Sequence, residues 1–99
     1  MNQFGIDEDE LEIVLSVLKR YDGIEKAVIF GSRAKGNYEE YSDIDIAIFS
    51  KENLAGEILT DFDEELLIYK VDIISYNHIS SQALKEHIDR VGKIIYEKH

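Results

Sequence analysis

Three aspartates stand where the sequence otherwise indicates apolar strands. Asp43 and Asp45 lie two residues apart around the start of the β-branched run Ile44–Phe49, so both side chains emerge on one face of a strand. Asp72 lies inside a second such run, Val71–Tyr76. If the two strands are neighbours, two carboxylates about 5 Å apart repel by roughly 3 kcal/mol at an effective dielectric near 20. A fold accepts that repulsion where a cation neutralises it or a proton is retained.

The chemistry of these carboxylates indicates a site for a hard cation. Carboxylate oxygens suit Mg²⁺ or Mn²⁺ better than Zn²⁺, and no histidine stands near them in the sequence. We therefore predict that Asp43, Asp45 and Asp72 are catalytic residues and metal ligands for two Mg²⁺ or Mn²⁺ ions. In the alternative interpretation Asp43 is a turn residue and the other two point to solvent on a sheet edge, which is the commoner case for an isolated Asp-x-Asp pair.

A glycine and a serine follow the short apolar run Lys26–Phe30. At such a junction the backbone N–H groups of Gly31 and Ser32, with the serine hydroxyl, can meet an anion. Arg33 and Lys35 come directly after and add positive charge. We predict that these four residues bind nucleotide phosphates, although the spacing of a Walker-type loop is absent. The alternative is an ordinary turn that the two basic residues keep soluble.

The turn and the carboxylates together fit one reaction. The turn holds the outer phosphates of a nucleoside triphosphate, and one metal ion bridges those phosphates to Asp43 and Asp45. A second ion, shared with Asp72, lowers the pKa of an incoming hydroxyl for in-line attack on the α-phosphorus. Pyrophosphate leaves, and a nucleoside monophosphate remains on the acceptor.

The pattern of apolar residues indicates the elements that carry these groups. Leu11, Val14, Leu15 and Leu18 predict a helix that Gly23 ends. The other expected elements are strands over 26–30, 44–49, 71–76 and 93–96, a helix over about 52–67, and a last helix capped by Ser80. This order favours an α+β fold of one domain, 1–99, in which helices pack on a small mixed β-sheet of about four strands in two layers.

Composition excludes several classes of protein. The 99 residues carry 11 Lys and Arg against 21 Asp and Glu, a formal net charge of −10, which argues against direct nucleic-acid binding. There is no cysteine for a disulfide framework or thiol catalysis, and no apolar run approaches the roughly 18 residues of a membrane span. We expect a cytoplasmic protein that does not associate with membranes.

The motif residues resemble those of a known superfamily. Gly31-Ser32, ten intervening residues and Asp43-x-Asp45 resemble the signature of the DNA polymerase β-like nucleotidyltransferases. The stretches 31–36 and 42–48 resemble most the minimal nucleotidyltransferases (MNT), and Asp72 matches the third carboxylate of that family. The resemblance extends from the first helix to Tyr96.

The resemblance implies Mg²⁺-dependent transfer of AMP from ATP. Family members are often encoded beside a helical HEPN protein, act as the antitoxin of that toxin, and in some cases attach AMP to its tyrosine. If the roles of the family's motif residues apply to this sequence, Gly31 and Ser32 contact the phosphates and Asp43 and Asp45 bind metal. Asp72 is then a metal ligand or base. Lysine replaces the family's common arginine at Lys35, which keeps the charge but loses the bidentate fork.

The acceptor is left open by the sequence. A chain of this length lacks a separate acceptor-binding domain, so we expect the acceptor on a partner protein or on a second copy. One alternative is an inactive antitoxin that binds and masks its toxin; another is the catalytic subunit of a two-chain enzyme for small molecules such as aminoglycosides. The acidic stretches 7–12 and 61–65 fit a basic protein partner.

Histidines and tyrosines outside the motif have simpler interpretations. His87 falls on the apolar side of the last predicted helix and is expected to pack there, and His78 is expected in a loop. Tyr38 and Tyr41 lie in the loop between the phosphate turn and the carboxylates. They either stack on a base or pack the loop over the core, and we favour packing.

Overall fold

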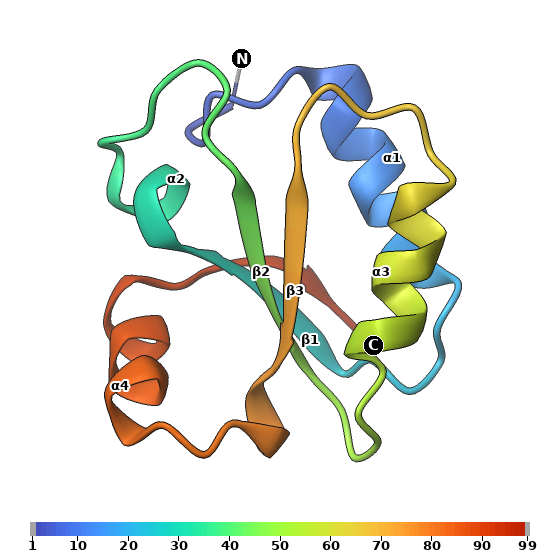
Figure 1. Ribbon diagram of the computed structural model, residues 1–99, viewed down its shortest axis with the longest axis vertical. Helices are drawn as coiled ribbons and strands as arrows, with labels where there is room; N and C mark the ends of the chain where they lie inside the picture. Colours follow the sequence, from blue (N-terminus) through green and yellow to red (C-terminus); the bar gives the residue numbers. More distant parts are fainter. Residues whose placement is uncertain (1, 99) are drawn as a thin grey trace.

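A four-stranded mixed sheet with helices on both sides forms the body of the molecule in the computed structural model, which describes residues 2–98 (Figure 1). In chain order the elements are α1 (Glu8–Lys19), β1 (Lys26–Phe30), α2 (Gly31–Lys35), β2 (Ile44–Phe49), α3 (Ala55–Asp63), β3 (Val71–Ser75), the 3₁₀ turn η1 (Tyr76–His78), α4 (Gln82–Val91) and β4 (Lys93–Glu97). The predicted α+β class is confirmed.

The strands lie in the order β3-β2-β1-β4. β1 pairs antiparallel with both β2 and β4, whereas β2 and β3 are parallel. The parallel pair is joined through α3, as parallel strands require a crossover connection. β2 is therefore central and has the two neighbours that matter for the predicted site.

Strand limits follow the β-branched runs of the sequence closely, and helix limits do so less well. β1 and β2 begin and end where predicted. α3 covers only Ala55–Asp63 of the predicted 52–67, and α4 is capped by Ser81 rather than Ser80, because the Ser81 side chain accepts from the Leu84 amide. α1 ends at Lys19 with Arg20 as its C-cap, so Gly23 does not end it.

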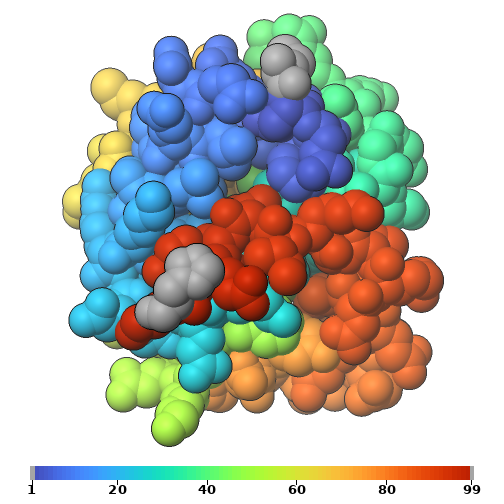
Figure 2. Space-filling model, turned by 180° about the vertical axis from the view of Figure 1, so that it is seen from behind, coloured from blue at the N-terminus to red at the C-terminus, as the bar shows by residue number. Residues whose placement is uncertain are grey.

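Helices cover both faces of the sheet, so the molecule has three layers where the sequence predicted two. α1 and α3 cover one face over a large core that includes Ile44, Ile46 and Ile48 of β2. α2 and α4 lie on the other face, where a smaller cluster contains Phe30 and Ile88. Seen from behind, β4 crosses the molecule between α1 and α4 (Figure 2). No helix within residues 2–98 has the length and apolar content to cross a bilayer.

Polar contacts join the residues that follow α1 to α3 and to the segment just after it. The Tyr21 hydroxyl donates to the Asp61 carboxylate and lies 3.1 Å from the carbonyl oxygen of Glu57. Arg20 Nη2 donates to Glu65 Oε1 at 2.8 Å. The hydrogen bond to Asp61, with burial and the nearby negative charges, raises the pKa of Tyr21 to about 12.

Replacing Tyr21 by Phe removes the hydroxyl and keeps the ring. We expect the free energy of unfolding to fall by about 0.5–1 kcal/mol near pH 7. Since the pKa of Tyr21 rises from 10.0 to about 12 on folding, the folded chain binds more protons between these values, and wild-type stability declines as the pH rises through them. This decline should be smaller in Tyr21→Phe than in wild type.

Urea unfolding at pH 7 to 12 measures both effects. Tyr41→Phe is the control, because Tyr41 is 67% exposed. If the stability of wild type and of Tyr21→Phe declined equally as the pH rose from 10 to 12, the raised pKa would not belong to Tyr21.

Candidate active site

The structure brings two of the predicted carboxylates side by side. In the parallel register of β2 and β3, Asp45 lies opposite Asp72, so both side chains point to the same face of the sheet. Asp43 stands one residue before β2 and is exposed. Because it lies two residues before Asp45, its side chain is on the same side of the chain as that of Asp45. The inference from sequence that the two strands are neighbours is confirmed. The shared face is the one on which α2 and α4 pack.

Asp45 bears the electrostatic cost of this arrangement. The residue is half-buried, and burial is the main cause that raises the pKa of its carboxyl above the ordinary value of 3.8. The negative charges of Asp72 and then Asp43 raise it further. The three carboxylates therefore interact in the folded chain, and a cation among them would relieve their repulsion.

Gly31 is held against the Asp45 carboxylate. The antiparallel register places Asp45 opposite Phe30, the last residue of β1, and Gly31 follows with φ +74°. A β-carbon at Gly31 would collide with Oδ2 of Asp45. Only glycine fits both the left-handed backbone and this close approach.

The segment after β1 is a short helix instead of the predicted turn. α2 begins at Gly31, and no side chain caps its N-terminus. The first N–H groups of a helix have no partner within the helix and point toward its N-terminal side. Gly31, the first residue of α2, lies against the Asp45 carboxylate. Lys35 is exposed at the other end of α2.

Arg33 is placed differently from the prediction. It is 1% exposed, and its guanidinium donates to backbone carbonyls, among them those of Phe4 and Ser42. A buried guanidinium engaged in this way is not open to a nucleotide. The expectation that Arg33 binds phosphate is therefore corrected: its guanidinium is buried and its donors are taken by backbone carbonyls.

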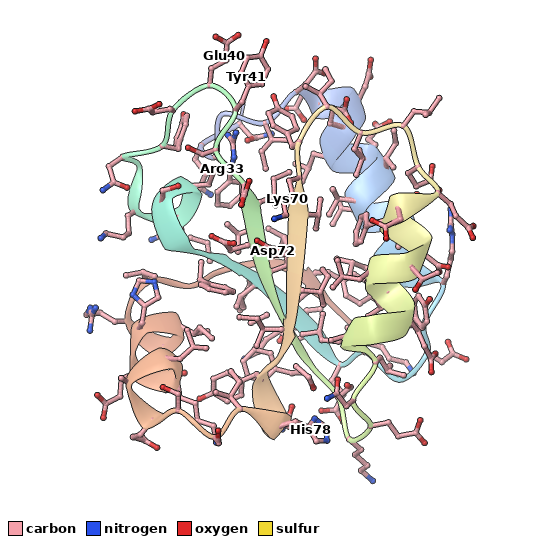
Figure 3. All side chains as sticks on the ribbon, viewed as in Figure 1. Arg33, Glu40, Tyr41, Lys70, Asp72 and His78 are labelled. Carbon is pink, nitrogen blue, oxygen red and sulfur yellow. The ribbon has the colours of Figure 1, made fainter. Side chains whose placement is uncertain are left out.

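The remaining aromatic residues divide between packing and exposure. His87 packs edge-on against Phe30 with ring centroids 6.1 Å apart, as predicted. Tyr38 packs on Arg33, but Tyr41 is 67% exposed, so packing was the wrong expectation for Tyr41. His78 lies at the opposite end of the sheet from Arg33 and Asp72 (Figure 3). Its Nδ1 shares a hydrogen bond with the Ser75 hydroxyl.

The donor chemistry of the carboxylates is compatible with a magnesium ion. Within residues 2–98 no three His, Cys, Asp or Glu side chains are gathered closely enough to enclose a metal ion by themselves. Mg²⁺ does not need such a cage, because it keeps several waters and is commonly held by one or two carboxylates together with substrate phosphates. Asp45 and Asp72, side by side with Asp43 close by in the sequence, provide that donor chemistry.

The start of α2 at Gly31 and the Asp45–Asp72 pair lie at the positions of the motif identified in the sequence. The chain matches the family described as "Polymerase beta, Nucleotidyltransferase" over residues 12–99 and belongs to it. The resemblance inferred from Gly31-Ser32 and Asp43-x-Asp45 is thereby confirmed.

Two relatives show how far the similarity extends along the chain. "Probable protein adenylyltransferase MntA" of Haemophilus influenzae is 36% identical over 100 residues, covering 97% of this chain and 87% of that protein. "Protein adenylyltransferase MntA" of Aphanizomenon flos-aquae is 30% identical over 100 residues, covering 88% of this chain and 66% of that protein.

Solved structures share the fold. A chain of a toxin–antitoxin complex with AMP-PNP superimposes with a TM-score of 0.72 at 21% identity, over 95% of this chain and 76% of the other. A chain from the complex of tri-AMPylated Shewanella oneidensis HEPN toxin with MNT antitoxin gives a TM-score of 0.63 at 20% identity, over 94% and 74%.

Replacing Asp45 by Asn removes one of the repelling charges. The pKa of Asp45 is higher in the folded than in the unfolded chain, so the folded chain binds more protons between the two values. Wild-type stability therefore falls as the pH rises through that interval, and Asp45→Asn lacks this loss. We expect Asp45→Asn to be more stable than wild type at pH 7 without metal, and the difference to shrink as the pH falls toward 4.

Urea unfolding between pH 4 and 7 in the presence of a chelator tests this expectation. Asp63→Asn, which neutralises an exposed carboxylate at the end of α3, is the matched control. If Asp45→Asn were no more stable than wild type at pH 7, the repulsion among the carboxylates would not lower the free energy of unfolding.

Proposed function

We propose that this chain transfers AMP from ATP to a hydroxyl of a partner protein, in a reaction that depends on Mg²⁺. The observation that carries the proposal is the Asp45–Asp72 pair on neighbouring strands, held beside the uncapped start of α2 at Gly31. The adenylyltransferase names of relatives at 36% and 30% identity support the choice of AMP.

The start of α2 is the proposed phosphate site. Its free N–H groups and the Ser32 hydroxyl donate to the outer phosphates of ATP, and the absence of a β-carbon at Gly31 lets the phosphates approach the main chain. Lys35, exposed on the same helix, adds positive charge with a side chain long enough to reorient toward the phosphates.

The carboxylates are the proposed metal ligands. Asp43 and Asp45 would hold the ion that the phosphates share, and Asp72 would hold a second ion or accept the proton of the acceptor hydroxyl. When bound, Mg²⁺ supplies charge neutralisation at the phosphates and lowers the pKa of an adjacent hydroxyl. Asp72 is suited to the acceptor side, because β3 is an edge strand of the sheet and a second protein can approach it there.

We further propose that the acceptor is a tyrosine of a HEPN-type toxin, so that the chain acts as an antitoxin. Likeness to chains from toxin–antitoxin complexes supports a partner of this kind, and the net charge of −10 favours a basic protein surface over RNA or DNA. In the reaction the tyrosine oxygen bonds to the α-phosphorus, pyrophosphate leaves, and the hydroxyl proton passes to a base such as Asp72.

Transfer of label tests the proposal directly. The purified chain is incubated with Mg²⁺, ATP labelled at the α- or γ-phosphate, and the product of the adjacent gene. We expect the α-label alone to move to a tyrosine of that product, as mass spectrometry can establish. Asp43→Asn with Asp45→Asn should lower the transfer on the order of 100-fold or more.

The double variant Asp22→Asn with Glu52→Gln is the matched control, since it removes two exposed charges ahead of β1 and beyond the end of β2, outside the motif and outside the acidic stretches 7–12 and 61–65. Absence of transfer by the wild-type chain would refute the proposed activity. If the inactive double variant still protected cells from the toxin, masking by binding would explain the antitoxin effect. Label appearing on a small molecule instead would favour the two-chain enzyme.

A further inference from the structure

Arg33 is a fully buried charged side chain, with 1% of its surface exposed. A charge in the interior is costly unless it is hydrogen-bonded or paired. Both ion pairs found within residues 2–98 belong to Arg20 instead. The compensation for Arg33 must therefore come from other groups.

Four backbone carbonyls provide it. Arg33 Nε donates to Ser42 O at 2.9 Å and Nη2 to Glu40 O at 3.1 Å. Nη1 donates to Phe4 O at 2.8 Å and to Gly5 O at 3.2 Å. Arginine suits this position because its planar fork directs several donors in fixed directions at once, which a lysine ammonium does not.

Two tyrosine rings complete the environment of the guanidinium. Its central carbon lies 5.1 Å from the ring centroid of Tyr38 and 4.7 Å from that of Tyr69, both within cation–π distance. Gly5 makes room for the first ring: its φ is +66°, and a β-carbon there would collide with Tyr38. The glycine is thus part of the same cluster.

The contacts of Arg33 join three segments that lead into the site. They hold residues 4–5 ahead of α1, the loop 36–43 that ends at Asp43, and Tyr69, three residues before Asp72. Arg33 itself stands two residues after Gly31 on α2. Figure 3 shows Arg33, Glu40 and Asp72 toward the same end of the sheet.

We propose that Arg33 is a positioning residue that holds the backbone around Asp43 in the geometry required for metal and nucleotide binding. The bonds to Glu40 and Ser42 fix the chain immediately ahead of Asp43, and the bonds to residues 4–5 anchor the guanidinium to the N-terminal segment. The importance of that geometry for catalysis rests on the proposed function; the ordering of the loop does not.

Arg33→Lys tests the inference, because lysine keeps the charge and loses the fork. Arg20→Lys is the matched control at an exposed position paired with Glu65. Three properties are measured for each variant: thermal unfolding, amide hydrogen exchange, and affinity for Mn²⁺ in the presence of AMP-PNP by electron paramagnetic resonance.

We expect Arg33→Lys to fold and to accelerate exchange about tenfold at residues 38–43 while β1 and β2 stay protected. Mn²⁺ affinity should fall about tenfold, as when a group that orients a metal ligand is removed. Arg20→Lys should change neither the exchange at residues 38–43 nor the Mn²⁺ affinity. Wild-type exchange in the loop of a folded Arg33→Lys chain, or acceleration spread evenly over all strands, would overturn the positioning role.

Gly5→Ala is the second variant, should Arg33→Lys not fold. It leaves Arg33 intact and displaces Tyr38 beneath it, so the same selective rise in loop exchange and loss of Mn²⁺ affinity are expected. Gly56→Ala in α3 is the control, since nothing lies within 4 Å of the added carbon. A Gly5→Ala chain that matches Gly56→Ala in both readouts would overturn the inference.

Failure of the proposed function would look different. If the wild-type chain transferred no AMP, that proposal would fall, and hydrogen exchange in the loop would still decide the role of Arg33. If wild type is active and the inference holds, Arg33→Lys lowers kcat with little change in KM for the acceptor. Unchanged kcat in the variant would overturn the positioning role alone.

Discussion

The close approach of the Asp45 carboxylate to the main chain of Gly31 is the constraint on which the site depends. A side chain at position 31 would occupy the space of that carboxylate, so the chain turns from β1 into α2 through a glycine with positive φ. The antiparallel register that sets Asp45 opposite Phe30 determines where this contact falls. The parallel register of β3 then adds Asp72 beside Asp45. Two strand pairings and one glycine thus assemble the start of a helix and the paired carboxylates at one place.

Such a cluster of like charges has to be supported by packing elsewhere. β2 divides the two tasks by the alternation of its side chains: Ile44, Ile46 and Ile48 are buried in the large core beneath α1 and α3, and Asp45 faces the other way. The larger core belongs to the face without the site. The carboxylates can therefore repel one another without disturbing the packing that stabilises the sheet, and the cost appears locally, as a raised pKa of Asp45.

The sequence was informative wherever the deciding interactions are local. β-branched runs located β1 and β2 to the residue, and the period of two along a strand placed Asp43 and Asp45 on one face. α3 proved shorter than its apolar spacing suggested, because that spacing continues past Asp63 into a segment that leads to β3 without remaining helical. The glycine at position 31 was recognised as a turn residue, but its role beside Asp45 depends on strand pairing.

Arg33 could not have been placed from the sequence. Beside Gly31-Ser32 it resembles a phosphate ligand, and what buries it is a set of carbonyls at Phe4, Gly5, Glu40 and Ser42. Every residue has a backbone carbonyl, so the sequence does not mark which ones act as acceptors. Two of these four lie 29 and 28 residues from Arg33 in the chain. Tyr69 joins the cluster from a third segment. Side-chain type specified what Arg33 can donate to, and only the tertiary fold specified which acceptors it meets.

The net charge of −10 is distributed in a way that bears on which ligands can enter. Arg33 is buried and Arg20 is paired with acids, so neither opposes the acidic surface. A free triphosphate approaching Asp43 and Asp45 would be repelled, whereas one that carries a divalent cation has less negative charge and brings the ion that relieves the carboxylates. The repulsion at Asp45 is a cost of the free chain that such a ligand removes, and any ligand that favours the folded state stabilises it. In the proposed function, the repulsion at Asp45 and the binding of a cation-bound nucleotide would be one electrostatic property of the same carboxylates.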